Sequence, residues 1–383
     1  MKCDRHNTPV RRQQKIPPAL SRQIIRHLLT WFSKNARDLP WRRTRDPYAI
    51  WVSEIMLQQT QVATVIPYWI RWMTALPTLA NLADAPQDRV LKLWEGLGYY
   101  NRARNLQGAA KMIVNEYNAR FPESFAALLE LPGIGRYTAG AICSIAYDQP
   151  TPVLDGNVVR ILTRIFGIGG NPKEKVTNTQ LWSLAEGLVQ TAARIRSSCS
   201  HLNQSLMELG ALICTPHHPS CDVCPVRRHC VAKRDDRTGE LPNLGPRIKS
   251  TARNFFALII ERDGQFLVRQ REAGDVNAGL WEFPNAELTR ATLTNSRSIR
   301  AVAKSQFHIA ITKPNPMFQI RRSVTRYRDT IEVFRASITS KKALREKPWR
   351  WLNLDELNAI ALSGAHRKIL KRLVDGANAA HCF

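Results

Sequence analysis

Four cysteines lie close together in the middle of this 383-residue chain, at Cys214, Cys221, Cys224 and Cys230. Gaps of six, two and five residues separate them. Thiolates this close in sequence can surround one inorganic centre, which constrains the loop between them. Thiolate ligands alone do not distinguish zinc from an iron–sulfur cluster. The first gap is longer than in the short cysteine pairs of zinc fingers, so the spacing favours a [4Fe–4S] cluster with a structural role.

The charge of the chain indicates a polyanionic partner. Lys and Arg number 56 against 31 Asp and Glu, for a net charge of +25 at pH 7. Residues 231–383 hold 28 basic and 15 acidic side chains, and residues 1–230 hold 28 and 16. Because both parts are basic, a cationic tail is not the source of the excess. We expect a nucleic acid as the partner, and basicity without a specific partner is the alternative.

The sequence predicts neither a membrane span nor a secretion signal. No window approaches the roughly 18 consecutive apolar residues of a transmembrane helix. The first 19 residues are polar and basic, without an apolar segment before a cleavage site. We therefore expect a cytoplasmic, nucleoid-associated monomer with no membrane partner, in which a metal centre is a better interpretation of the cysteines than disulfides.

Changes in composition and in the apolar pattern divide the chain into an arm, two folded regions and a linker. Residues 1–19 are interpreted as a basic, disordered arm. Residues 20–230 predict successive helices broken at prolines, with Ser21 as a candidate cap of the first. Residues 231–252 are charged and contain Pro and Gly, which predicts a linker. Residues 253–383 predict a separate α+β domain.

The predicted α+β domain has recognisable strand and helix signals. Apolar runs separated by turn residues predict strands over residues 255–260, 265–269, 331–334 and 349–352. A helix is expected over residues 365–374 at the end of the domain.

A glycine-containing turn is a candidate phosphate-binding site, called here the phosphate grip. Leu131–Gly135 reads Leu-Pro-Gly-Ile-Gly and separates two helical stretches. Glycines let backbone N–H groups approach an anion, and the N-terminus of the following helix favours negative charge. Gly133 and Gly135 are therefore predicted to bind DNA phosphates without reading bases. A simple packing corner between two helices is the alternative.

Two carboxyl groups are candidates for acid and anion chemistry. On a helix, Glu54 lies beside Ile50, Trp51 and Leu57, so burial is expected to raise its pKa. A raised pKa suits a general acid, but a buried Glu paired with an Arg such as Arg37 or Arg42 is an equally good interpretation. Asp155 interrupts an apolar stretch and is either functional, with Asn157 orienting it, or a helix N-cap, or both. Glycoside-cleaving enzymes use such an acid together with an anion.

Five motifs in order resemble a known family. They are Leu39–Arg42 (LPWR), Trp51–Val62 (WVSEIMLQQTQV), Leu131–Ile142 (LPGIGRYTAGAI), Pro152–Arg160 (PVLDGNVVR) and the cysteine cluster. The last three are similar to the helix–hairpin–helix DNA glycosylases of the endonuclease III superfamily. The first two resemble its MutY-type adenine glycosylases, which act on adenine mispaired with 8-oxoguanine. The resemblance covers residues 20–230 closely.

The resemblance implies catalytic roles for four residues. Glu54 matches the general acid that protonates adenine, and Asp155 matches the aspartate that stabilises the cationic sugar. Asn157 would support Asp155. Tyr137 occupies the position of the Schiff-base lysine of bifunctional relatives, which implies a monofunctional enzyme.

The resemblance also implies binding residues. Adenine-contacting positions match Trp41, Arg42, Leu57 and Gln204. Gln59 and Tyr99 match residues that wedge into the duplex, and Thr60 is assigned to the same DNA-binding group. The partner implied is double-stranded DNA with adenine opposite 8-oxoguanine or guanine, and the cofactor implied is a [4Fe–4S] cluster.

Residues 253–383 resemble the Nudix-like recognition domain of the same family. Gly279–Pro284 (GLWEFP) fits it, but residues 285–300 lack the acidic Nudix box, so pyrophosphatase activity is not expected. Alignment on Phe307-His308 places Ser305 in the lesion-reading loop, between Lys304 and Gln306. The expected fold is thus an all-α catalytic region with helix–hairpin–helix and [4Fe–4S] loop, followed by an α+β Nudix-like domain. Alternatives are an endonuclease III-like or other mismatch glycosylase and a non-catalytic DNA-binding protein.

Overall fold

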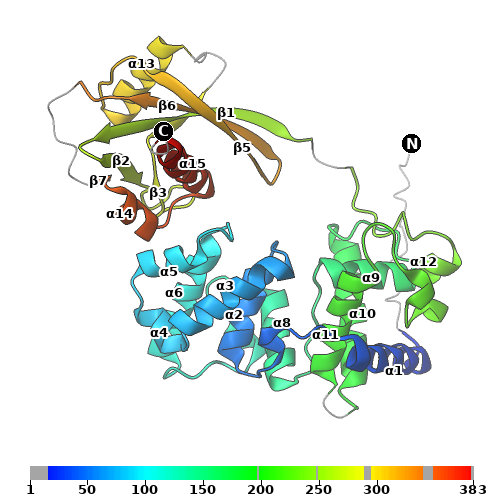
Figure 1. Ribbon diagram of the computed structural model, residues 1–383. Helices are drawn as coiled ribbons and strands as arrows, with labels where there is room; N and C mark the ends of the chain where they lie inside the picture. Colours follow the sequence, from blue (N-terminus) through cyan, green and yellow to red (C-terminus); the bar gives the residue numbers. More distant parts are fainter. Residues whose placement is uncertain (1–15, 196–197, 247–248, 289–294, 340–347, 381–383) are drawn as a thin grey trace, which may run out of the picture. The chain divides into compact units, whose positions relative to one another are not determined.

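The computed structural model describes residues 16–195, 198–246, 249–288, 295–339 and 348–380 (Figure 1). The chain forms two compact units. Unit 1 comprises Met1–Ala80 and Ala109–Arg247, and unit 2 comprises Asn81–Gly108 and Ile248–Phe383. The expected disordered arm lies almost entirely outside the described residues. None of the described helices is long and apolar enough to cross a membrane.

Unit 1 is helical, and the described chain has no strand before residue 251, as the sequence predicts. Its helices are α1 (Pro18–Asn35), η1 (Pro40–Arg42), α2 (Pro47–Leu57), α3 (Val62–Ala75), α7 (Phe125–Leu129), α8 (Arg136–Tyr147), α9 (Gly156–Phe166), α10 (Lys175–Ala192), α11 (Cys199–Leu212), η2 (Cys221–Val223), η3 (Arg227–His229) and α12 (Val231–Arg234). Helices α4 (Leu79–Asp84) and α6 (Asn101–Glu116) cross the boundary between the units.

Helix α11 lies at the centre of one core of unit 1, because α1, α8, α9 and α10 all contact it (Figure 1). Two glycines make close approaches possible there. A Cβ added at Gly140 on α8 would collide with the backbone carbonyl of Pro152, and one added at Gly210 on α11 would collide with Asn157. Because glycine has no side chain, the segment before α9 can pack closely against α8, and the first turn of α9 can pack closely against α11.

Two boundaries in unit 1 differ from those expected. Helix α1 begins at Pro18, and Ser21 is buried inside it. Proline favours the first turn because its fixed φ suits a helix and its missing N–H leaves no donor unpaired. The expected linker begins with helix α12, and Leu241 is buried. The side chain of Arg164 holds this segment by donating to the carbonyl oxygens of Thr238 and Leu241.

Unit 2 contains a seven-stranded sheet with the central path β3-β2-β1-β6-β5, while β4 pairs with β1 and β7 with β2. Strands β1 and β6 are parallel, and the other pairs are antiparallel. The strands are β1 (Thr251–Arg262), β2 (Gln265–Gln270), β3 (Trp281–Glu282), β4 (Asn285–Leu288), β5 (Asn315–Val324), β6 (Tyr327–Ala336) and β7 (Trp349–Leu352). The four predicted strands lie within β1, β2, β6 and β7.

Helices cover both faces of this sheet (Figure 1). Ala257 and Ile259 of β1 share a core with α15 (Gly364–Ala380), which contains the predicted terminal helix. Phe256 and Leu258 share the opposite core with α13 (Ser296–Phe307). A strand buried on both faces reads as a continuous apolar run, as residues 255–260 do. The remaining helix of this region is α14 (Leu354–Ala359).

Residues 81–108, including α5 (Gln87–Trp94), group with unit 2, whereas the sequence predicts that they belong with residues 20–230. Contacts distant in sequence account for this grouping. Glu95 accepts hydrogen bonds from the Leu362 N–H at 2.8 Å and from Arg367 Nε at 2.9 Å. Lys92 donates to the Ile360 carbonyl at 3.1 Å.

Candidate active site

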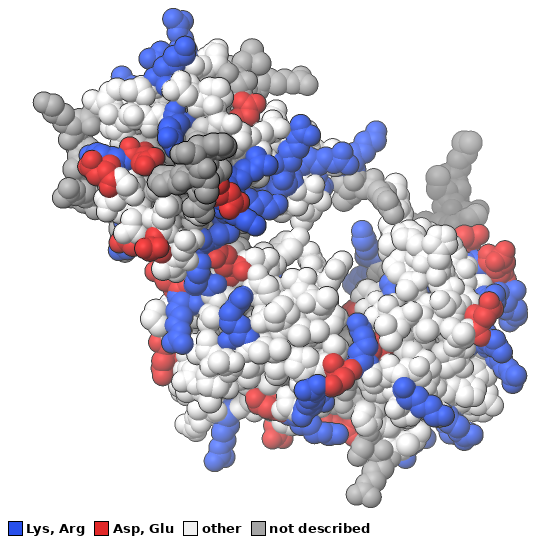
Figure 2. Space-filling view, viewed as in Figure 1, with Lys and Arg blue, Asp and Glu red and all other residues white. Residues whose placement is uncertain are grey.

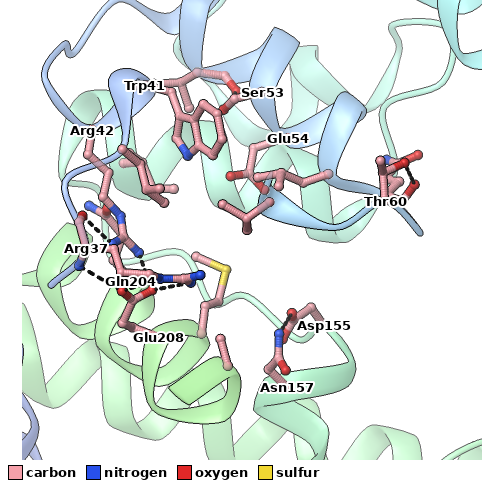
Figure 3. A pocket seen from close by; sticks show the side chains of 18 of the residues that line it. Arg37, Trp41, Arg42, Ser53, Glu54, Thr60, Asp155, Asn157, Gln204 and Glu208 are labelled. Carbon is pink, nitrogen blue, oxygen red and sulfur yellow. Dashed lines mark hydrogen bonds and ion pairs between the residues drawn. The ribbon is translucent and has the colours of Figure 1, made fainter. Parts of the chain in front are cut away.

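The site is a cavity of about 490 Å³ in unit 1 (Figure 3). Helices α2, α8 and α11, the segment before α9 and the short helix η1 all contribute side chains. Predicted catalytic, base-binding and DNA-binding residues line it together: Trp41, Arg42, Glu54, Leu57, Gln59, Thr60, Tyr137, Asp155, Asn157 and Gln204. The structure therefore brings the two candidate carboxyl groups, 101 positions apart in the sequence, to one site.

Glu54 is a buried acid on α2, with 5% of its surface exposed. The Tyr137 hydroxyl donates to its Oε2 atom at 2.7 Å. Burial raises the pKa of Glu54 to about 7, against the opposing effect of the Tyr137 hydrogen bond. The charge of Asp155 contributes to this rise, and the charge of Arg42 opposes it. A carboxyl with a pKa near neutrality can hold a proton and release it, as a general acid must.

Asp155 is both the N-cap of α9 and a residue of the cavity. Its carboxylate accepts hydrogen bonds from the Val158 N–H at 2.7 Å and from the Asn157 side-chain amide at 2.9 Å. Burial raises the pKa of Asp155, while these two donors and Arg160 oppose the rise. The donors favour the charged form. The N-cap interpretation of Asp155 is thus confirmed, and the same residue lines the cavity, as its functional interpretation requires.

Arg160 holds Asn157 in place, a contact that the sequence did not indicate. Its Nη2 atom donates to Asn157 Oδ1 at 2.8 Å and to the Gly210 carbonyl at 2.7 Å. Its Nε atom donates to the Cys214 carbonyl at 2.7 Å. These bonds tie the first turn of α9 to the C-terminal end of α11, and so fix the amide that contacts Asp155.

Glu208 is a second buried carboxyl in the cavity wall that sequence reasoning missed. Arg37 and Arg42, the candidate partners of Glu54, both pair with Glu208 instead, at 2.7 and 2.9 Å (Figure 3). Although burial opposes it, hydrogen bonds from the two arginines lower the pKa of Glu208 to about 2. Glu208 is therefore an anion at neutral pH, while Glu54 retains the capacity to hold a proton.

The wall of the cavity is largely apolar beside these charges. Trp41, Leu57 and Met207 contribute to it, and the indole of Trp41 meets that of Trp69 edge-on at 6.1 Å. The amide nitrogen of Gln204 donates to Ser200 one turn earlier on α11. An apolar pocket with a few polar groups suits a planar base removed from the DNA stack.

Three predicted DNA-binding residues do not line the cavity. Gly133 has a φ of 78° in the turn before α8, and Gly135 is the N-cap of that helix. Both are exposed, as a phosphate grip requires. Tyr99 belongs to unit 2, is 43% exposed and has a φ of 46°.

Ser305 is exposed, but it lies within α13 and not in a loop as expected. Its hydroxyl donates to the Val302 carbonyl at 3.4 Å. The helix continues to Phe307 because Ile299, Ala303 and Phe307 form an apolar stripe that packs on the sheet.

The four cysteines line a second cavity in unit 1, together with Arg164 and Lys233. The Nη1 atom of Arg164 lies 3.3 Å from Cys214 Sγ and donates to the Thr215 carbonyl at 2.8 Å. Among the described residues, no group of three ligands has the geometry to hold a single metal ion. The loop thus gathers four thiol groups around one space, with cations beside them.

Outside the cavities, Figure 2 shows Lys and Arg side chains gathered in unit 2 where β1 begins, near the turn between β5 and β6. Thr251 at the start of β1 pairs with Tyr327 beside that turn. Arg326 and Arg328 are exposed there. A cluster of this kind attracts a polyanion.

Comparisons with known proteins agree with the architecture. Residues 52–186 match the family model described as HhH-GPD superfamily base excision DNA repair protein, and residues 255–372 match the NUDIX domain. A solved structure of a thermostable thymine-DNA glycosylase is similar to 57% of this chain and 98% of its own, with 31% identity and a TM-score of 0.51. These matches confirm the expected helix–hairpin–helix region and Nudix-like domain.

Curated relatives extend the similarity to both units. The human adenine DNA glycosylase is 34% identical, over 93% of this chain and 74% of the relative. The mouse adenine DNA glycosylase is also 34% identical, over 91% and 77%. The rat protein of the same name is 45% identical over 68% of this chain and half of its own length. This chain therefore belongs to the adenine DNA glycosylase family.

Proposed function

We propose that this protein hydrolyses the N-glycosidic bond of adenine mispaired with 8-oxoguanine or guanine in double-stranded DNA. The observation that carries the proposal is the pair formed by Glu54 and Asp155, which line one cavity in different environments. Membership of the adenine DNA glycosylase family supports adenine as the base. The net charge of +25 supports DNA as the partner.

In the proposed reaction, Glu54 gives its proton to a ring nitrogen of the flipped adenine. The bond from C1′ of the deoxyribose to the base breaks, and the electron pair leaves with the base. The Asp155 carboxylate stabilises the positive charge that develops on the sugar. A water molecule then adds its hydroxyl to C1′ and returns a proton to the Glu54 carboxylate, so adenine and an abasic site are the products.

Tyr137 supports a monofunctional enzyme. Burial and the nearby carboxyl groups raise the pKa of its hydroxyl well above the usual value, so the phenol stays protonated. A phenol cannot form the Schiff base that an amine forms with the opened sugar. We expect no enzyme–DNA adduct to be trapped by borohydride. Trapping together with strand nicking before alkali treatment would contradict the monofunctional assignment.

A [4Fe–4S] cluster is proposed for the cavity lined by Cys214, Cys221, Cys224 and Cys230. In such a cluster each thiolate binds a different iron, whereas one zinc ion needs all four sulfurs within about 2.3 Å of it. The four thiol groups, gathered around one cavity beside Arg164 and Lys233, fit this centre by their number and donor chemistry. The cluster would cross-link the loop, and visible absorbance with iron analysis tests this assignment.

Unit 2 is proposed to read the base opposite adenine. Its Nudix-like fold, its basic cluster near the start of β1 and the wedge position Tyr99 support this role. Ser305 is exposed on the last turns of α13, where it could reach a ligand. Residues 285–300 contain no acidic Nudix box, so a role in nucleotide hydrolysis is not proposed.

A glycosylase assay on four duplexes separates this function from its alternatives. We expect adenine release opposite 8-oxoguanine and guanine, and little opposite thymine or cytosine. Release of thymine from a mismatch would instead support an activity like that of the similar thymine-DNA glycosylase. Tight DNA binding without release of any base would support a non-catalytic DNA-binding protein.

A further inference from the structure

Glu208 forms a hydrogen-bond network with Arg37 and Arg42 in the cavity wall. Neither Glu54 nor Asp155 accepts a hydrogen bond in this network. Its side chain is 1% exposed. Arg37 donates to it three times, through the backbone N–H at 2.9 Å, Nε at 2.8 Å and Nη2 at 2.7 Å. Arg42 donates once, through Nη2 at 2.9 Å. A buried carboxylate that accepts four hydrogen bonds is held in one orientation.

Three groups contact the guanidinium of Arg42. Besides Glu208, its Nη1 atom donates to the Arg37 carbonyl at 3.1 Å, and its carbon centre lies 5.3 Å from the centre of the Phe32 ring. Only 16% of the side chain is exposed, and it lines the cavity. A free arginine side chain samples many rotamers, so these contacts reduce the ordering needed when a base enters.

We propose that Glu208 is a positioning residue that fixes the orientation of Arg42 in the base pocket. This inference rests on the proposed function, because it assumes that a purine enters the cavity. Held by Glu208, Arg42 presents the same edge of its guanidinium to each base. Glu208 itself acts through Arg42 and not on the reacting bond.

The same carboxylate balances charge around Glu54. The charged and titratable groups that act on Glu54 are Tyr137 from α8, Asp155 before α9 and Arg42 from η1. Arg42 lowers the pKa of Glu54, and Glu208 pairs with both Arg42 and Arg37. The negative charge of Glu208 opposes both cations. Its removal is therefore expected to lower the pKa of Glu54 and to reduce the protonated fraction at neutral pH.

The experiment measures single-turnover adenine release and DNA affinity for the full-length protein and its variants. Glu208→Gln keeps the size of the side chain and removes its charge. We expect base release about ten- to a hundredfold slower, since misplacement of a positioning group has effects of this size. DNA affinity should change far less, because the phosphate contacts are untouched. Glu186→Gln, exposed on α10, is the matched control.

A double-mutant cycle with Arg42→Met tests whether Glu208 acts through Arg42. In the Arg42→Met background, Glu208→Gln should slow the reaction by less than threefold, because the residue to be positioned is absent. The alkaline limb of the rate–pH profile should move to lower pH in Glu208→Gln alone. Equal effects of Glu208→Gln in both backgrounds would overturn the proposal, since they indicate a purely structural role.

Glu208→Asp keeps the negative charge, and the same rates and pH profiles are measured on it if Glu208→Gln folds poorly. Partial recovery of the rate by Glu208→Asp, with the pH profile of the parent, is expected. An unchanged rate in folded Glu208→Gln would refute the inference while leaving the proposed function intact. Failure of the parent protein to release adenine would refute the proposed function instead.

Discussion

The Tyr137 hydroxyl donates a 2.7 Å hydrogen bond to Glu54, and this bond joins helices α8 and α2 across 83 positions of the sequence. Burial raises the pKa of the acid, and the Tyr137 bond moderates the rise. The pKa of the tyrosine is itself raised well above its usual value. The proton therefore stays on the phenol oxygen while Glu54 titrates near pH 7, which allows the carboxyl group to act as a proton donor.

Replacement of Glu54 by Gln should abolish most of the activity. The amide has the size of the carboxyl but no transferable acidic proton, so base release should slow by about 10²–10⁴-fold. Single-turnover release of adenine from DNA measures this, and melting temperature checks the fold. Glu186→Gln, exposed on α10, should release adenine at the parental rate. Parental activity of Glu54→Gln would contradict its role as the acid.

Replacement of Tyr137 by Phe should change the pH dependence. The rate should be highest while Glu54 is protonated and fall as the pH rises through its pKa of about 7. The Tyr137 bond lowers that pKa, so its removal should raise it and move the alkaline limb to higher pH. Rate–pH profiles of both proteins measure the shift. A limb displaced to lower pH would be inconsistent with the assigned bond.

Asp155→Asn should separate catalysis from folding. Asn is as good an N-cap as Asp, so the free energy of unfolding should change by less than about 1 kcal/mol. The neutral side chain cannot stabilise a cationic sugar, and we expect a loss of rate of about 10²–10³-fold or more. Urea unfolding and single-turnover kinetics provide the two measurements. Asp155→Ala should lose both the cap and the rate.

Arg164→Met should destabilise the cysteine loop. The buried guanidinium donates to the carbonyl oxygens of Thr215, Pro216, Thr238 and Leu241. Acceptors left unpaired cost about 1–3 kcal/mol each where they stay buried, so we expect a loss of at least about 3 kcal/mol in the free energy of unfolding. The iron content that we propose for this loop should fall in parallel. Arg194→Met, exposed after α10, should retain both.

The carboxyl pair was a candidate from the sequence because each residue interrupts an apolar pattern, and the family resemblance added the proposed roles. Glu54 is surrounded by Ile50, Trp51 and Leu57, and Asp155 follows an apolar run. Four of the seven strands of unit 2, β1, β2, β6 and β7, were also predictable, since their apolar runs are bounded by turn residues. Ser305 was expected in a loop because the family resemblance places it there. It lies in helix α13 instead, since the apolar stripe that ends at Phe307 favours a helix.

Glu208 could not be identified in the same way. It occupies an ordinary helical position, and its partner Arg37 lies 171 positions earlier in the chain. Likewise, residues 81–108 carry no local signal that they belong with unit 2. Ion pairs such as Glu95 with Arg367 form only when distant segments pack together.

The sequence by itself determined the helical first region, the α+β second region, the cysteine loop and the two candidate carboxyl groups, because these depend on local pattern and residue type. Only the tertiary structure decided which charges meet. It buried Glu54 beside Tyr137 and paired both arginines with Glu208. Proton affinity depends on solvent exclusion and on neighbouring charges within a few ångströms, and the folded chain alone sets both.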